Sequence, residues 1–154
     1  MDGNKLTNTF KSAILDAKEL AKKSNHQFLR PVHVLLAMMN EGNIALLKIL
    51  ELTGCDTNKL KKSLLNYLIT MPEVTGFETG ILPSQELIRT LEDCETIREQ
   101  NGDSFIPTET FLIAMSRNSN EISEILLENG INEKKIVHAI NAVNGGKPMY
   151  SADD

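Results

Sequence analysis

Apolar residues recur at helical spacing in four stretches before residue 71, and polar or glycine-containing segments separate the stretches. The expected helices begin near Thr7, Pro31, Ile44 and Asp56. Thr7 and Asp56 are good N-cap residues, and a proline such as Pro31 is tolerated in a first helical turn. No stretch alternates between apolar and polar residues as a half-buried strand does. The pattern therefore predicts helices and no strands.

Residues 71–83, MPEVTGFETGILP, interrupt this pattern. They contain two prolines and two glycines and show no helical period. We expect an irregular linker whose apolar side chains anchor it to the domain: Val74, Phe77, Ile81 and Leu82. Helical spacing resumes after Ser84, a further N-cap candidate, and ends at Gly145–Gly146.

The second half of the chain repeats the first. Phe28–Met39 reads FLRPVHVLLAMM, and Phe105–Ser116, 77 residues further on, reads FIPTETFLIAMS. The same spacing pairs the two expected N-caps, Thr7 and Ser84. After the loss of one residue, a spacing of 76 pairs Gly54 with Gly130 at the expected helix ends.

This match predicts an internal duplication. The expected fold is all-α, a pseudo-twofold duplicated four-helix repeat of about eight helices with an irregular central linker. We assign about residues 6–70 to repeat one, 71–83 to the linker and about 84–144 to repeat two. The domain then covers residues 1–146, and residues 147–154 begin a flexible linker.

Composition narrows the class of protein. The chain has 154 residues, 41% of them hydrophobic and 24% charged, as in soluble globular domains. Its longest apolar run, Val34–Met39, is far shorter than the roughly 20 residues that span a bilayer, and no apolar signal segment opens the chain. Cys55 and Cys94 stand alone, which indicates two buried or half-buried thiols in a reducing, cytoplasmic location.

The charge is unevenly distributed. Net charge is -5, which argues against a nucleic acid as partner. Residues 1–82 carry ten Lys and Arg against eight Asp and Glu, whereas residues 83–154 carry six against thirteen. The acidic second half can serve solubility, or it can attract basic ligands; both interpretations stay open.

The chain shows no arrangement typical of a catalytic site. His26, His33 and His138 lack the spacing of metal ligands, and neither cysteine has a convincing catalytic partner. Gly145–Lys147 reads GGK but lacks the spacer and hydroxyl residue of a phosphate-binding loop. We therefore expect a binding module without metal or nucleotide, and a structural or solvent-edge role for His33.

Several strings carry a family resemblance. Residues 31–39 read P-x-H-x-L-x-A-M-M; residues 6–10 read LTNTF, 25–33 NHQFLRPVH, 82–91 LPSQELIRTL and 101–109 NGDSFIPTE. With the duplicated four-helix unit, they resemble the N-terminal domain of Clp-type AAA+ unfoldases, and within that group the ClpB-type disaggregases.

The resemblance implies a function. ClpB-type proteins are stress-response chaperones in which an ATP-driven hexameric ring threads aggregated polypeptides through its pore, together with the DnaK chaperone system. Their N-terminal domain contacts unfolded or aggregated clients and passes them to the ring. ATP and Mg²⁺ belong to ATPase modules that this chain lacks. The domain alone is expected to be a non-catalytic monomer without cofactor, and without nucleic acid or membrane partners.

The resemblance also implies substrate contacts at Thr7, Asp103 and Glu109. Each residue has a structural explanation as well: Thr7 caps a helix, Asp103 follows Gly102 in a turn, and Glu109 suits the first turn of a helix.

A groove hypothesis follows from these contacts. Asp103 and Glu109 would edge a shallow apolar groove, with Leu91 and Ile97 as its floor, although helical spacing places both of these on a core-like stripe. Thr110 departs from the apolar residue that relatives often carry, which would make the groove less adhesive.

Three alternatives remain open. The chain could come from a protease-associated Clp ATPase whose N-terminal domain docks adaptor proteins, or it could be a free-standing regulator of the same fold. A helical DNA-binding module is the third, and the negative net charge disfavours it.

Overall fold

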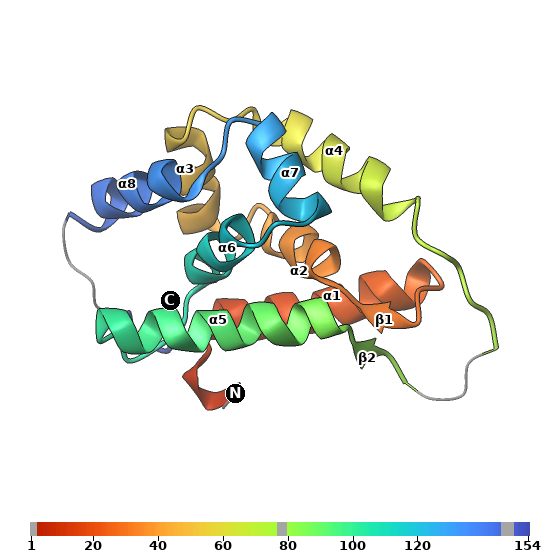
Figure 1. The fold of residues 1–154 in the computed structure, drawn as a ribbon. Helices are drawn as coiled ribbons and strands as arrows, with labels where there is room; N and C mark the ends of the chain where they lie inside the picture. Colours follow the sequence, from red (N-terminus) through yellow and green to blue (C-terminus); the bar gives the residue numbers. More distant parts are fainter. Residues whose placement is uncertain (1–2, 77–79, 146–149) are drawn as a thin grey trace.

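The computed structural model describes residues 3–76, 80–145 and 150–154, which form eight α-helices, a short 3₁₀ helix and two very short strands (Figure 1). In chain order they are η1 Gly3–Lys5, α1 Asn8–Lys23, β1 Phe28–Leu29, α2 Pro31–Met38, α3 Ile44–Leu52, α4 Thr57–Leu68, β2 Leu82–Pro83, α5 Gln85–Asn101, α6 Thr108–Arg117, α7 Glu121–Glu128 and α8 Glu133–Asn144. Helices α1–α4 form repeat one and α5–α8 form repeat two. The predicted helical fold of about eight helices is confirmed.

The expected cap residues begin and end the helices. Thr7 Oγ1 accepts a hydrogen bond from the Phe10 N–H at 3.3 Å, and Ser84 Oγ accepts one from the Leu87 N–H at 3.1 Å. These are the same contacts in the two repeats, as the duplication predicts. After α3 and α7 the chain turns at Gly54 and Gly130, whose φ angles of +87° and +77° lie in the left-handed region.

The fourth helix of each repeat packs against both repeats: within its own repeat α4 contacts α2, and α8 contacts α6. Within each repeat the first two helices pack together, α1 with α2 and α5 with α6. Helix α4 of repeat one packs against α7 of repeat two, and α8 of repeat two packs against α3 of repeat one (Figure 1). The buried side chains of the two repeats therefore form one continuous core.

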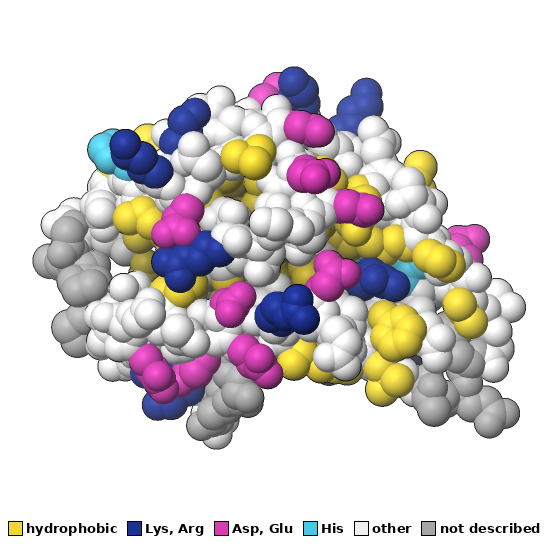
Figure 2. Space-filling view, in the orientation of Figure 1, with side chains coloured by type: hydrophobic (Ala, Val, Ile, Leu, Met, Phe, Trp, Pro, Cys, Tyr) yellow, Lys and Arg dark blue, Asp and Glu magenta, His cyan; other side chains and the backbone are white. Residues whose placement is uncertain are grey.

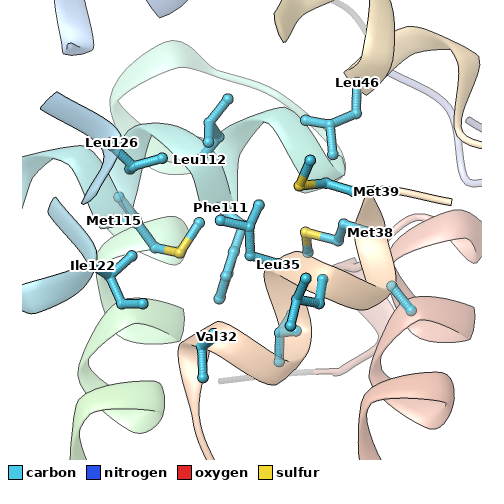
Figure 3. Close-up of a cluster of buried hydrophobic side chains, with 14 of the residues drawn as sticks. Val32, Leu35, Met38, Met39, Leu46, Phe111, Leu112, Met115, Ile122 and Leu126 are labelled. Atoms are coloured by element: carbon cyan, nitrogen blue, oxygen red, sulfur yellow. The ribbon is translucent and has the colours of Figure 1, made fainter. Parts of the chain in front are cut away.

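The central helices of the core are α2 and α6, the two copies of the short repeated string. Figure 3 shows Val32, Leu35 and Met38 of α2 facing Phe111, Leu112 and Met115 of α6. All six side chains are buried. The Phe10 ring of α1 meets the Phe111 ring edge to face, with centroids 5.7 Å apart. The aromatic pair therefore joins repeat one to repeat two at the middle of the core.

Two short parallel pairings also join the repeats. Strand β1 pairs with β2, with Leu29 opposite Pro83, and an isolated bridge pairs Leu6 with Ile106. The repeat spacing turns one pairing into the other, because Leu6 corresponds to Pro83 and Leu29 to Ile106. The expectation of no strands was wrong. Pairings of two residues are too short to leave an alternating pattern in the sequence.

The linker is held differently from the expectation. Val74 and Leu82 are 37% and 46% exposed, so they do not anchor it; Ile81 packs against the core, and Phe77 lies outside the described residues. Among the linker residues that the structure describes, Met71 is the buried one. Backbone bonds attach the linker to the loop after α1, because the Val74 N–H donates to the Asn25 carbonyl at 2.7 Å.

An exposed hydrophobic group remains beside this attachment. Phe28 and Leu82 are opposite each other in the β1–β2 pair and are 38% and 46% exposed. Figure 2 shows hydrophobic side chains gathered over this pair, while acidic and basic side chains are interspersed over the rest of that face.

A pair of histidines is buried at the loop after α1. His33 is fully buried and His26 is 4% exposed, and their Nε2 and Nδ1 atoms are 2.9 Å apart. His33 Nδ1 accepts the Arg30 N–H at 2.9 Å, so its Nε2 carries the proton that is donated to His26. The structural role expected for His33 is confirmed, and it lies in the core rather than at the solvent edge.

Candidate functional site

Two neighbouring cavities open where α1 and α6 begin and α8 ends. The larger has a volume of about 450 Å³ and is lined by residues that include Thr7, Ile44 and Glu109. The smaller has a volume of about 270 Å³. Asn144 and Tyr150 line both cavities, so the segment after α8 forms their common border.

Glu109 lies at the end of a buried polar chain. The Asn43 side-chain amide donates to Thr108 Oγ1 at 3.0 Å, and the Thr108 hydroxyl donates to Glu109 Oε1 at 3.1 Å. Asn43 is also the N-cap of α3, where its Oδ1 accepts from the Leu46 N–H. A cap residue of repeat one thus fixes the position of a carboxylate in repeat two.

The environment of Glu109 disfavours its charge. The side chain is only 5% exposed. Burial raises the pKa of Glu109 above its usual range, and the nearby Asp154 charge raises it further. Hydrogen bonds from its own N–H and from the Thr108 and Tyr150 hydroxyls act in the opposite direction. A cation or hydrogen-bond donor that enters the larger cavity would therefore stabilise the charged form of Glu109.

Asp103 occupies the smaller cavity. It follows Gly102, whose φ of +71° ends α5 in the left-handed conformation. The Arg98 guanidinium donates to the Asp103 carbonyl oxygen at 2.9 Å and holds the turn rather than the carboxylate. Asp103 is 6% exposed, its Oδ1 has no hydrogen-bond partner, and burial raises its pKa. An unpartnered buried carboxylate oxygen is costly unless a ligand supplies a donor.

The smaller cavity also has apolar walls. They come from α5, α6 and α8: Ile97, Ile113, Val137 and Ile140. A carboxylate surrounded by isoleucines suits a side chain with an apolar stem and a donor at its tip, such as lysine or arginine.

The structure separates the predicted site residues into three groups. Thr7 and Glu109 line the larger cavity, and Asp103 and Ile97 line the smaller. Leu91 and Thr110 line neither cavity: Leu91 packs against the core, and Thr110 is 6% exposed in the first turns of α6. The threonine at position 110 therefore does not change the surface of either cavity.

Sequence reasoning did not find the residues that complete the site. Asn43, Asn144 and Tyr150 were missed, since polar residues at helix ends have ordinary capping explanations. One feature of the sequence does point to Tyr150. It is one of only two tyrosines in the chain and stands in the segment YSADD, four residues after the Gly145–Gly146 pair that ends the last expected helix.

Other kinds of site find no support in the residues that the structure describes. No group of three or more His, Cys, Asp and Glu side chains in those ranges is placed to hold a metal ion. No described helix is long and apolar enough to cross a membrane. Cys55 and Cys94 are both free and buried, as the sequence predicts. Burial raises the pKa of each thiol, which keeps both unreactive.

Comparison with known proteins identifies relatives of the chain. Residues 5–129 match the family model described as the Clp repeat (R) N-terminal domain. The chaperone protein ClpB of Pseudomonas putida is 30% identical over 150 residues, which is 97% of this chain. ClpB of Rickettsia conorii is 33% identical over 148 residues, or 96% of the chain. The chain spans only 18% and 17% of the lengths of these two relatives.

Solved structures share the fold. The N-terminal domain of Hsp104 from Candida albicans superposes with a TM-score of 0.83 at 22% identity, covering 97% of this chain and 99% of that one. The N-domain of ClpV from Vibrio cholerae gives a TM-score of 0.75 at 16% identity, covering 93% and 87%. The eight-helix arrangement is thus the fold of Clp N-terminal domains.

Proposed function

Because the chain belongs to the Clp N-terminal repeat family, we propose that it is the client-binding domain of an ATP-dependent protein disaggregase. In this proposal the domain contacts unfolded or aggregated polypeptides and delivers them to an ATPase ring. The domain itself is not catalytic. The ring, its ATP and Mg²⁺, its hexameric state, its work with the DnaK system and its cytoplasmic location belong to the proposal for the whole protein.

The carrying observation is the pair of buried carboxyl groups in adjacent, partly apolar cavities. Unfolded polypeptides differ from folded ones in exposing apolar side chains next to free backbone amides and basic side chains. Asp103 Oδ1 lacks a hydrogen-bond donor, Glu109 is a buried carboxyl group with a raised pKa, and the apolar side chains around Asp103 accept an apolar stem. Chemistry of this kind selects unfolded chains by class and not by sequence.

The size of the site suits transient binding. Each cavity admits one or two side chains, and together they cover a short stretch of polypeptide. Interfaces far below the roughly 1,200 Å² of stable complexes are weak. Weak binding helps a domain that must release its client to the ring.

Neutralising the two carboxyl groups should weaken client binding. We expect the Asp103→Asn and Glu109→Gln variants to bind a fluorescein-labelled, reduced and carbamidomethylated lactalbumin, whose blocked cysteines add no negative charge, roughly tenfold less tightly than the unmodified chain, since hydrogen bonds to charged groups contribute about 1.5–3 kcal/mol. Fluorescence anisotropy at low salt measures the affinities, and thermal unfolding followed by circular dichroism checks that the variants fold.

Matched controls remove a carboxylate elsewhere. Asp16→Asn on α1 and Glu124→Gln on α7 are exposed positions that line neither cavity. These variants should bind within about twofold of the unmodified chain, because single surface charges contribute little. If all four variants bind the unfolded polypeptide alike, the site is elsewhere and the proposal fails. Binding only to folded partner proteins would favour an adaptor-docking domain instead.

A further inference from the structure

The segment Tyr150–Asp154 folds back over the start of α1. The Asn8 N–H donates to the Ala152 carbonyl at 2.7 Å, and the Asn8 side-chain amide donates to Asp153 Oδ1 at 3.2 Å. Asn8 is the first residue of α1, so its N–H has no carbonyl partner within the helix. The segment therefore satisfies a donor that would otherwise need an acceptor from outside the helix.

Tyr150 inserts its side chain between the two cavities. Its hydroxyl accepts a hydrogen bond from the Asn144 side-chain amide at 2.9 Å, and the residue lines both cavities. Burial and the nearby Glu109 raise the pKa of Tyr150 to about 12, so the ring stays neutral there. An aromatic side chain and a backbone carbonyl are also what an unfolded polypeptide would bring to this place.

The charge of the segment does not match the site that it covers. Asp154 lines the larger cavity, and its charge contributes to the raised pKa of Glu109. On the other side of Tyr150, Asp103 Oδ1 has no donor. Like charges at close range oppose docking, so a neutral or basic chain would fit the same place better.

In repeat one, the linker after α4 lies in the corresponding place and is held more firmly. After α4, the linker passes over the loop that contains His26, which corresponds to Asp103 at the repeat spacing of 77. There the buried polar group has a partner, because His26 is paired with His33, and strand β2 holds the far end of the linker. Residues 150–154 form no strand. The segment Tyr150–Asp154 is therefore better suited to displacement than the linker of repeat one.

We propose that Tyr150–Asp154 is an intramolecular competitor that occupies the client site and is displaced by the client. The incoming chain places a large apolar or aromatic side chain where Tyr150 lies, and one of its carbonyl groups accepts the Asn8 N–H. Chains with basic residues beside that side chain are favoured over acidic ones. This inference rests on the proposed client-binding function and adds a regulated, partly closed resting state.

Loosening the segment should tighten client binding. Tyr150→Ala removes the inserted ring, and Ser151→Pro removes the N–H that donates to Asp154 Oδ2 at 2.7 Å and closes the terminal turn. We expect each variant of the 154-residue chain to bind labelled, carbamidomethylated lactalbumin about three- to tenfold more tightly, because the competent state becomes more populated. The matched control is Tyr67→Ala on α4, the other tyrosine, which lines neither cavity and should leave the affinity unchanged.

The exchange rate of the Asn8 amide hydrogen shows whether the segment Tyr150–Asp154 is docked, and it does so independently of the affinity for the client. Without client, exchange at Asn8 should be faster in Tyr150→Ala and Ser151→Pro than in the unmodified chain, and saturating lactalbumin should slow it again in all three. Unchanged Asn8 exchange in both variants would overturn the inference. So would faster exchange with unchanged or weaker client affinity, and that result would leave the proposed function intact. Absence of lactalbumin binding in every variant would instead overturn the proposed function itself.

Discussion

Replacing Phe111 by alanine should lower the free energy of unfolding by about 3–5 kcal/mol. The side chain is fully buried in α6 and contacts Phe10 of α1 across the junction of the two repeats. Its loss leaves a cavity where neither repeat can close the gap alone. Urea denaturation followed by circular dichroism measures the change. It is a large fraction of the free energy of unfolding of a typical domain, which is roughly 5–15 kcal/mol.

Two further experiments make this result specific. Phe28→Ala deletes the same side chain at a position that is 38% exposed, and it should cost less than about 1 kcal/mol. A double-mutant cycle between Phe10 and Phe111 should give a coupling of about 0.5–1.5 kcal/mol beyond the burial of each ring. Equal losses for Phe28→Ala and Phe111→Ala would contradict the placement of Phe111 in a shared core.

Acidification from pH 7 to pH 5 should destabilise the protein through its buried histidine pair. Burial lowers the pKa of His33 from 6.5 to about 4, and the charges of His26 and Arg30 act in the same direction. The folded state therefore keeps His33 neutral while the unfolded state takes up a proton. Stability from this group is complete above about pH 6.5 and is lost as the pH falls toward 4. The loss at pH 5 is about 2 kcal/mol, at ~1.4 kcal/mol per pKa unit.

Other groups shift stability in the opposite direction. Asp103 and Glu109 have raised pKa values in the folded state, so their protonation favours folding as the pH falls. The His33 contribution is isolated by His33→Asn, in which an amide oxygen can still accept the Arg30 N–H. This variant should lose less stability than the unmodified chain between pH 7 and pH 5, by about 2 kcal/mol. His138→Asn, at an exposed position of α8, controls for the loss of one imidazole. Equal pH dependence of His33→Asn and the unmodified chain would contradict the assignment.

The duplication, the helices and their caps were predictable because they depend on neighbouring residues. Thr7 and Ser84 bond to N–H groups three residues away, and Gly54 and Gly130 turn the chain where a side chain would be strained. The pairing of α4 with α7 and of α3 with α8 was not predictable, because identical apolar stripes fit a partner in either repeat. The Leu6–Ile106 bridge depends on that pairing and was missed with it.

The candidate site was only partly predictable for a similar reason. Thr7 and Glu109 are 102 positions apart, and only family resemblance placed them in one site. Tyr150 lines both cavities, and its segment is held by a bond from the Asn8 N–H to the Ala152 carbonyl, a contact between residues 144 positions apart that no local pattern encodes. The His26–His33 pair was missed because the histidine spacing was considered only for metal ligation, which it does not fit, and not for a hydrogen bond between the two rings.

The most direct test of client binding at the two cavities is an NMR titration. A ¹⁵N-labelled sample of the 154-residue chain is titrated with unlabelled, carbamidomethylated lactalbumin, and the amide shifts are followed at each residue. We predict that the largest changes fall at Asn8, Asp103, Glu109 and Asn144, around the two cavities. Changes confined to the exposed hydrophobic group of Phe28 and Leu82, with these four amides unmoved, would contradict the account.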